Sequence, residues 1–130
     1  MADLQLPHDH GNDESIIDMS RRLEDGECYR ILADAFKQLS DPARIKIFWL
    51  LCHCEECVMN ISAIVGMSSP AVSHHLRGLR AADLVVSTRK GKEVYYTVPD
   101  SARCRLFHQI IEEMLAVTCP SISLSATNER

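Results

Sequence analysis

The stretch SSPAVSHHLRGLRAADLVVSTRKGKEVYYTV, residues 68–98, decides the fold of this 130-residue chain. Its first half begins like a helix, because a serine can cap the free amide groups of the first turn and Pro70 fits there without losing a hydrogen bond. Val72, Leu76 and Leu79 share one side of the predicted helix. This side is therefore expected to pack inward.

A second short helix is predicted immediately before this one. Ile61, Ile64 and Val65 are spaced to share one helix face, and Gly66 can adopt the left-handed conformation that ends a helix. Two short helices joined by a tight turn form a helix-turn-helix, whose second helix enters the major groove of DNA. The outward side chains of that helix, which can read base edges or contact phosphates, are Ser73, His74, Arg77 and Arg80.

The second half of the stretch predicts a β-hairpin. Two runs rich in β-branched and aromatic residues flank RKGK, residues 89–92, whose glycine suits a tight turn. Arg89, Lys90 and Lys92 give the tip three positive charges, placed to touch the phosphates of DNA. The predicted fold class is therefore mainly α with a β-hairpin wing (α+β), a winged helix-turn-helix.

Charge is unevenly distributed along the chain. The formal net charge is −4, yet acidic residues dominate residues 1–27 whereas basic residues dominate residues 68–98. The field near one face steers a polyanion more than the net charge does, so double-stranded operator DNA is the expected partner. The N-terminus has no basic start and no apolar core, and no apolar run is long enough to span a bilayer. We therefore expect a cytoplasmic protein without a membrane partner.

Apolar spacing predicts three further helices. The first runs from Cys28 and carries a stripe expected to be buried, formed by Leu32, Ala35, Phe36 and Leu39. The second begins at SDPAR, residues 40–44, with Ser40 or Asp41 as its cap. The third begins after Pro99 and carries a broad apolar stripe of Leu106, Phe107, Ile110, Ile111, Met114 and Leu115. Such a stripe at the end of a small domain often pairs with its copy, which predicts a homodimer.

These elements suggest three segments. Residues 1–13 are expected to be a flexible N-terminal arm, and residues 119–130 a disordered tail. Residues 14–118 are expected to form the winged helix-turn-helix domain together with its terminal dimerisation helices.

The segment CHCEEC, residues 52–57, concentrates soft metal ligands. In a reducing compartment its cysteines are better candidates for metal ligands or redox thiols than for disulfides. If the segment is helical, Cys54 and Cys57 share a face by i,i+3 spacing, and His53 joins Cys57 by i,i+4 spacing. Thiolates favour Zn²⁺, Cd²⁺, Pb²⁺ or As(III), and a tetrahedral site needs further ligands. His53, together with His8 or His10 from the arm, could supply them.

The order of these elements resembles that of the ArsR/SmtB family of bacterial metal-sensing repressors. The likeness runs from about Cys28 to Met114 and is most specific at LSDPARIKI (39–47), AVSHHLRGLRAADLV (71–85) and RKGKEVYY (89–96). The resemblance implies a winged-helix homodimer that holds an operator when ligand-free and releases it when an inducer binds.

The resemblance also bears on individual residues. Together with the outward face and the wing, it gives the expected DNA-binding set: Ser68, Ser69, Ser73, His74, His75, Arg77, Arg80, Arg89, Lys90 and Lys92. For His75, which lies toward the buried flank, packing is the alternative. The family's Glu-Leu-Cys-Val-Cys inducer motif corresponds to residues 55–59, where Cys57 is kept and Met59 replaces the second cysteine. A second family site keeps only Asp100, since the other places hold Ala102, Glu113 and Ala116.

The predicted function is a repressor that releases DNA when a soft metal ion of the Zn²⁺, Cd²⁺ or Pb²⁺ class binds a thiol-rich site. The expected ligands are Cys54, Cys57, Cys52, His53, His8 and His10. In the main alternative the same repressor senses an oxidant, reactive sulfur, As(III) or Sb(III) through these cysteines. An oxidoreductase using Cys54 and Cys57 lacks the alternating strands and helices of a thioredoxin fold, so no enzyme is expected. Packing remains the simple alternative for the cysteines, and solvation for His8 and His10.

Overall fold

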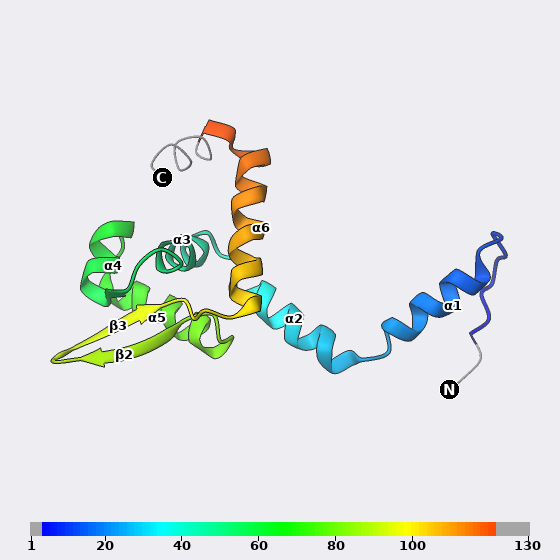
Figure 1. Cartoon of the computed structure of the whole chain (residues 1–130), viewed down its shortest axis with the longest axis horizontal. Coiled ribbons are helices and arrows are strands. Elements are labelled where there is room, and N and C mark those ends of the chain that lie inside the picture. Colours follow the sequence, from blue (N-terminus) through cyan, green and yellow to red (C-terminus); the bar gives the residue numbers. More distant parts are fainter. Residues whose placement is uncertain (1–3, 122–130) are drawn as a thin grey trace. The chain divides into compact units, whose positions relative to one another are not determined.

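The computed structural model describes residues 4–121. The chain divides after Asp34 into an N-terminal unit and a second unit that begins at Ala35. The second unit contains the helix-turn-helix and the hairpin, whose course can be followed in Figure 1. Parts of the predicted arm and tail, residues 1–3 and 122–130, lie outside the described residues.

The N-terminal unit contains the helix α1 (Asp13–Arg22) and the start of α2 (Gly26–Gln38). The helix α1 was not predicted from the sequence. Its first turn carries Asp13 and Glu14 and its last turn carries Arg21 and Arg22, charges that complement the helix dipole at both ends. The predicted helix from Cys28 is confirmed as α2, which begins two residues earlier.

Side-chain caps fix the starts of three helices in the second unit. Asp41 caps α3 (Pro42–Leu51), where its carboxylate accepts hydrogen bonds from the backbone N–H groups of Ala43 and Arg44 at 2.8 and 3.1 Å. The hydroxyl of Ser68 caps α5 (Ser69–Ala81), and that of Ser101 caps α6 (Ala102–Thr118). The three predicted helices are confirmed, and so are the caps predicted before Pro42 and Pro70, because these local hydrogen bonds satisfy amide groups that a helix leaves open.

The helix α4 (Val58–Val65) precedes α5 and completes the helix-turn-helix. It ends at Gly66, whose φ of +71° lies in the left-handed region, as predicted.

The sheet has three antiparallel strands in the order β1-β3-β2. The predicted hairpin is confirmed as β2 (Val86–Lys90) and β3 (Glu93–Thr97). Lys90 pairs with Glu93, so the loop has two residues, and Gly91 takes the positive φ of +65° that a type II′ turn requires at its first position. The third strand, β1 (Glu56–Cys57), pairs with β3 and was not predicted.

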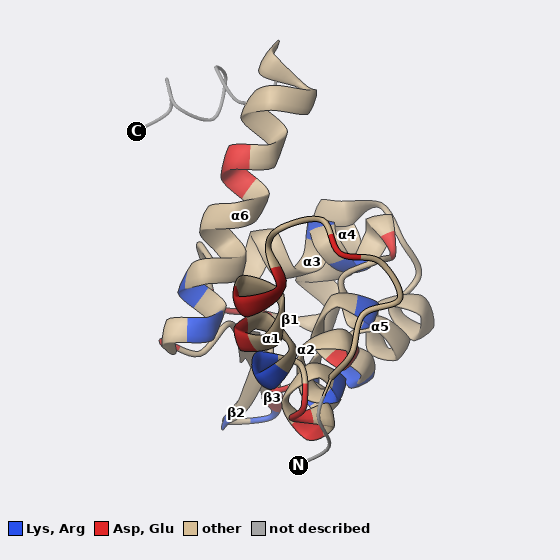
Figure 2. Ribbon diagram, turned by 90° about the vertical axis from the view of Figure 1, so that its right-hand side faces the viewer, with Lys and Arg blue, Asp and Glu red and all other residues tan. Residues whose placement is uncertain are grey.

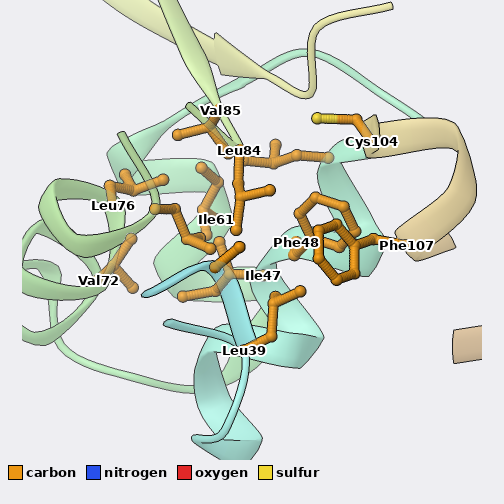
Figure 3. Close-up of a cluster of buried hydrophobic side chains, with 13 residues drawn as sticks. Leu39, Ile47, Phe48, Ile61, Val72, Leu76, Leu84, Val85, Cys104 and Phe107 are labelled. Atoms are coloured by element: carbon orange, nitrogen blue, oxygen red, sulfur yellow. The ribbon is translucent and has the colours of Figure 1, made fainter. Parts of the chain in front are cut away.

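One apolar core holds the helices of the second unit together. Ile47 and Phe48 from α3, Ile61 from α4 and Leu76 from α5 are almost completely buried, and Figure 3 shows their side chains gathered at one centre. None of the buried residues among those described is polar or charged. Burial of this apolar surface is the main force that keeps the recognition helix in place.

The stripe predicted to be buried on α2 is largely exposed in a single chain. Ala35 and Leu39 are buried, but Leu32 and Phe36 are exposed, so the prediction was wrong for these two residues. In the second unit, the C-terminal end of α2 and the apolar face of α6 line an open groove of about 300 Å³. Its residues are Phe36, Leu39, Ile45, Phe107, Ile110, Ile111, Met114, Leu115 and Thr118. Among the described helices, none combines the length and the apolar character needed to cross a membrane.

Candidate nucleic-acid interface and metal ligands

The helix α5 presents a polar face opposite its buried side. Val72, Leu76 and Leu79 are buried, as the helical wheel predicted. On the outward side His74, Arg77 and Arg80 are exposed, while Ser69 and Ser73 are half-buried. Figure 2 shows Lys and Arg segments on α5 and on the hairpin. The face therefore has the donors and the positive charge that duplex DNA requires.

Two of the predicted DNA-binding serines hold the helix-turn-helix together. The hydroxyl of Ser68 accepts a hydrogen bond from the backbone N–H of Ala71 at 3.3 Å. The hydroxyl of Ser69 lies 3.2 Å from that of Ser62 on α4, which joins the two helices at their turn. Ser68 and Ser69 thus both form contacts within the protein at the start of α5. The free backbone N–H groups at a helix start can also bind a phosphate.

The side chain of His75 faces inward and contacts α3. Its Nδ1 accepts a hydrogen bond from Nε of Arg44 at 3.0 Å, and its Nε2 lies 4.0 Å from a carboxylate oxygen of Asp41. Only 12% of the side chain is exposed, and this burial lowers the pKa of His75 although Asp41 opposes the shift. Because arginine can only donate, Nδ1 is the acceptor and the neutral ring carries its proton on Nε2.

Arg44 is a residue of this surface that the sequence analysis missed. Besides His75, its guanidinium contacts the side-chain oxygen of Gln38 and lies 3.4 Å from Nε2 of His74. It therefore adds positive charge beside the outward face of α5. Arg44 follows the cap Asp41 in the SDPAR motif, where the sequence indicates only an ordinary residue of the first helical turn. Its contacts with α5 involve residues about thirty positions later, so no local pattern indicates them.

The wing residues differ in their availability. Arg89 and Lys92 are exposed at the hairpin. The ammonium group of Lys90 forms an ion pair with Glu55 and lies 5.3 Å from the ring centre of Tyr95. The hydrogen bond to Glu55 raises the pKa of Lys90. A phosphate that binds Lys90 must therefore compete with Glu55.

The segment at residues 52–57 is not helical, so the ligand positions predicted from helical spacing are wrong. The helix α3 ends at Leu51, Cys52 is its C-cap, and Glu56 and Cys57 form the strand β1. Without helical geometry, the i,i+3 and i,i+4 spacings no longer place Cys54 and His53 on one face with Cys57. The chain turns at Cys52 and His53 and is extended at Glu56 and Cys57, where β3 pairs with it. Oγ1 of Thr97 lies 3.2 and 3.1 Å from the carbonyl oxygens of Leu51 and Cys54, and its single proton is shared between these two acceptors.

The thiols of this segment lie in different surroundings. Cys57 is buried in β1, and Sγ of Cys54 donates to the carbonyl of Leu50 at 3.4 Å. Cys52 lines a cleft of about 170 Å³ that Cys104 and His108 also line. Burial raises the pKa of Cys52 to about 12 and also raises that of Cys54. Cys52 and Cys54 must lose a proton before they can bind a metal as thiolates.

His8 and His10 belong to the N-terminal unit. Their ring centres are 6.0 Å apart and the rings are stacked. Their approach to the thiol segment stays a prediction.

A cluster of potential metal ligands forms where the end of α3 meets α6. Within residues 4–121, the only group of three such side chains with ligand atoms within 4.8 Å of one another is His53, His108 and Glu112. Of these three residues, only His53 was predicted from the sequence as a metal ligand. The i,i+4 spacing of His108 and Glu112 on one helix was the available signal.

This architecture, a helix-turn-helix followed by a β-hairpin wing, defines a winged-helix DNA-binding protein. The model of the family described as "Bacterial regulatory protein, arsR family" matches residues 41–87. The transcriptional regulator CmtR of Mycobacterium bovis is 34% identical over 86 residues, 66% of this chain and 73% of CmtR. The chain belongs to the ArsR family.

Other relatives agree with this family. The transcriptional repressor SmtB homolog of Synechocystis is 35% identical over 64% of this chain and 63% of its own length. The cadmium resistance transcriptional regulatory protein CadC homolog of Staphylococcus aureus is 39% identical over 53% of this chain and 58% of its own length. The chain thus spans less than two thirds of these two relatives. Their names are those of regulators, which removes support for a dithiol oxidoreductase.

Solved structures share the fold. HlyU from Vibrio cholerae superimposes with a TM-score of 0.64 at 22% identity, covering 68% of this chain and 96% of HlyU. The homodimeric winged helix-turn-helix DNA-binding domain of a possible ArsR-family regulator from Mycobacterium bovis gives a TM-score of 0.62 at 22% identity, over 87% of this chain and 94% of that domain.

Proposed function

We propose that this chain is a cytoplasmic homodimeric repressor that binds operator DNA and releases it when a thiophilic metal ion binds the thiol segment at residues 52–57. The exposed His74, Arg77 and Arg80 of α5 would enter the major groove, and Arg89 and Lys92 of the wing would contact phosphates. Relatives named for cadmium resistance support a soft metal ion as the inducer.

The observation that carries this proposal is the pairing of the thiol segment with the wing. Cys57 pairs with Tyr95, and Glu56 with Tyr96, in the inner strand of the hairpin. Glu55 also holds Lys90 of the wing through an ion pair. A ligand that moves Cys54 or Cys57 therefore pulls on the strand that positions the wing. A coupling of about 1 to 3 kcal/mol is typical of allosteric sites and corresponds to about a 5- to 150-fold change in affinity.

The donor chemistry of the segment suits a soft ion, although one chain does not supply a complete set. Among residues 4–121, no group of three ligands within 4.8 Å includes a thiol. We propose that Cys54 and Cys57 are completed by Cys52 or His53 and by His8 or His10 of the arm of either subunit. A bound Zn²⁺, Cd²⁺ or Pb²⁺ ion would keep the thiols deprotonated and hold them together. Because burial raises the pKa of Cys52 and Cys54, we expect metal affinity to fall as the pH drops.

Cadmium is expected to weaken DNA binding of the reduced protein by about 5- to 150-fold. The probe is a labelled duplex enriched by this protein from a random-sequence pool, and fluorescence anisotropy at fixed salt measures the affinity. Cys54→Ser/Cys57→Ser should bind the duplex but ignore cadmium, whereas the control Cys28→Ser, which alters an exposed cysteine of the N-terminal unit, should respond normally.

Two other outcomes have defined meanings. If cadmium, zinc and lead all leave the affinity unchanged, the metal response is wrong. If peroxide or As(III) alone releases the duplex, the alternative signal is correct; the cleft shared by Cys52 and Cys104 favours that alternative as a place where two thiols could react together. The raised pKa of Cys52 opposes oxidation, because the thiolate is the reactive form.

The homodimer is proposed from the apolar groove between the end of α2 and α6. Met114 is 62% exposed in one chain and lines this groove. Met114→Glu should weaken self-association at least tenfold, because the carboxylate would lose water when the groove is covered. Sedimentation equilibrium should give twice the chain mass of 14.6 kDa for the unmodified protein and a value near 14.6 kDa for the variant. Met59→Glu, which changes a methionine that is 71% exposed on α4, should remain dimeric, and a monomeric unmodified protein would refute this surface.

A further inference from the structure

Three side chains from two helices point their ligand atoms at one place. His53 follows the C-terminal end of α3, and His108 and Glu112 lie one turn apart on α6. Nε2 of His53 is 3.2 Å from Nε2 of His108, which is 3.3 Å from Oε1 of Glu112. The third separation, between Nε2 of His53 and Oε1 of Glu112, is 4.0 Å.

Two of these separations match the edges of a zinc coordination tetrahedron. A Zn²⁺ ion bonded at about 2.0–2.1 Å to nitrogen and oxygen ligands holds neighbouring ligand atoms about 3.3–3.4 Å apart. Two of the three separations agree with this value within about 0.2 Å, and the third would have to shorten by about 0.6–0.7 Å through a shift of the Glu112 carboxylate. Two imidazoles with one carboxylate form a ligand set that zinc uses when it keeps one coordination position open.

Hydrogen bonds within the cluster are a poorer explanation of the same geometry. Nε2 of His108 is close to both Nε2 of His53 and Oε1 of Glu112. A single ring nitrogen carries at most one proton, so it cannot donate well to both neighbours. A cation between the three atoms would accept a lone pair from each of them.

A neighbouring side chain holds the carboxylate in place. The indole Nε1–H of Trp49 donates to Oε1 of Glu112 at 2.7 Å, and the Trp49 ring lies 4.5 Å from the ring of His53. Outer hydrogen bonds of this kind orient metal ligands and raise their affinity. The side chains of the three ligands are 27–30% exposed, so an ion can enter from solvent although the site is partly desolvated.

We propose that His53, His108 and Glu112 form a binding site for one divalent ion of the Zn²⁺ class per chain. Imidazole ligands favour Zn²⁺, Co²⁺ or Ni²⁺ over Mg²⁺ and Ca²⁺. Water or a solute occupies the fourth position. The site does not use the thiols of Cys54 and Cys57, and it clamps the end of α3 to α6. With His53 in this site, Cys52 is the candidate that completes the thiol pair. It does not depend on the proposed function, since the ion binds without DNA.

Cobalt titration of the full chain tests the proposal. In Cys54→Ser/Cys57→Ser protein, which lacks the thiol pair, Co²⁺ should bind once per chain and give the visible absorption of a tetrahedral ion without a strong near-ultraviolet thiolate band. Adding Glu112→Gln keeps an oxygen that can accept from Trp49 and removes the anionic ligand. This change should weaken Co²⁺ binding at least tenfold, and His108→Gln should do the same.

Two further variants sharpen the test. Trp49→Phe keeps an aromatic ring beside His53 and loses the N–H donor, so Co²⁺ binding should weaken by about 10- to 100-fold. His74→Gln changes an exposed histidine of α5 and should leave Co²⁺ binding unchanged. Circular dichroism checks that each variant is folded. Unchanged Co²⁺ affinity in both folded Glu112→Gln and folded His108→Gln protein would overturn the site, as would a strong thiolate band that neither change removes.

Discussion

Replacement of Phe48 by alanine is expected to lower the free energy of unfolding by about 3–5 kcal/mol. The Phe48 side chain is fully buried in α3 and lies in the core that α4, α5 and α6 share. Its removal loses the transfer energy of the ring and leaves a cavity that the surrounding helices can fill only in part. The free energy of unfolding of a small domain is only about 5–15 kcal/mol, so this single substitution removes a large fraction of the stability.

Urea unfolding followed by circular dichroism at fixed chain concentration measures this effect. The midpoint should fall while the slope with denaturant stays the same, because the surface exposed on unfolding is nearly unchanged. Met59→Ala, at an exposed apolar position, should shift the midpoint by far less. If Phe48→Ala cannot be purified as a folded protein, Phe48→Leu should show a smaller loss. A Phe48→Ala midpoint equal to that of Met59→Ala would contradict the assigned core.

Replacement of Arg77 by alanine is expected to weaken operator binding by about 1–3 kcal/mol for each half-site, which is a factor of about 5 to 150 for each subunit that binds. Arg77 is exposed on α5, one turn after Ser73, and no described interaction diverts its guanidinium from solvent. An arginine in this position can bind the O6 and N7 atoms of guanine at once. In a homodimer the substitution affects both half-sites of the operator.

Anisotropy with the enriched duplex and with a scrambled duplex at several salt concentrations distinguishes base recognition from phosphate binding. If Arg77 binds a base, the preference for the enriched duplex should fall. If it binds a phosphate, both duplexes should bind more weakly, and the salt slope should decrease by about 0.9 for each phosphate that the variant no longer neutralises. Arg21→Ala, which removes an exposed arginine from α1, is the control and should bind normally. Unchanged affinity of Arg77→Ala would exclude α5 as the recognition helix.

Local hydrogen bonds explain why the sequence predicted most elements of the fold. The caps at Asp41, Ser68 and Ser101 and the glycine turn at Gly66 depend on groups within a few residues of one another. Their patterns are therefore visible in a short stretch of sequence. The helix α1 was not predicted: only its first residue, Asp13, lay in the predicted arm, and no helix was expected in the domain before Cys28 although its end charges favour one.

Long-range contacts explain what the sequence analysis missed. The strand β1 has only two residues, and it exists because β3, about forty residues later, pairs with it. Similarly, 55 residues separate His53 from His108, so no spacing pattern brings their rings together. A cluster of cysteines is recognisable in the sequence because its thiols are close together along the chain and are soft metal ligands. His53, His108 and Glu112 become a possible site only because the fold places α6 against the end of α3.

The pairing of β1 with β3 constrains the length of the thiol segment more than its composition. Thr97 holds the carbonyls of Leu51 and Cys54, and the register of Cys57 opposite Tyr95 fixes the other end. One inserted residue in this short span would turn the Cys57 side chain from the core to the opposite face of the sheet. Side chains within the span face no such restriction. If the segment binds the inducer as proposed, its selectivity can therefore change by exchange of side chains, while the length of the backbone between these contacts stays fixed.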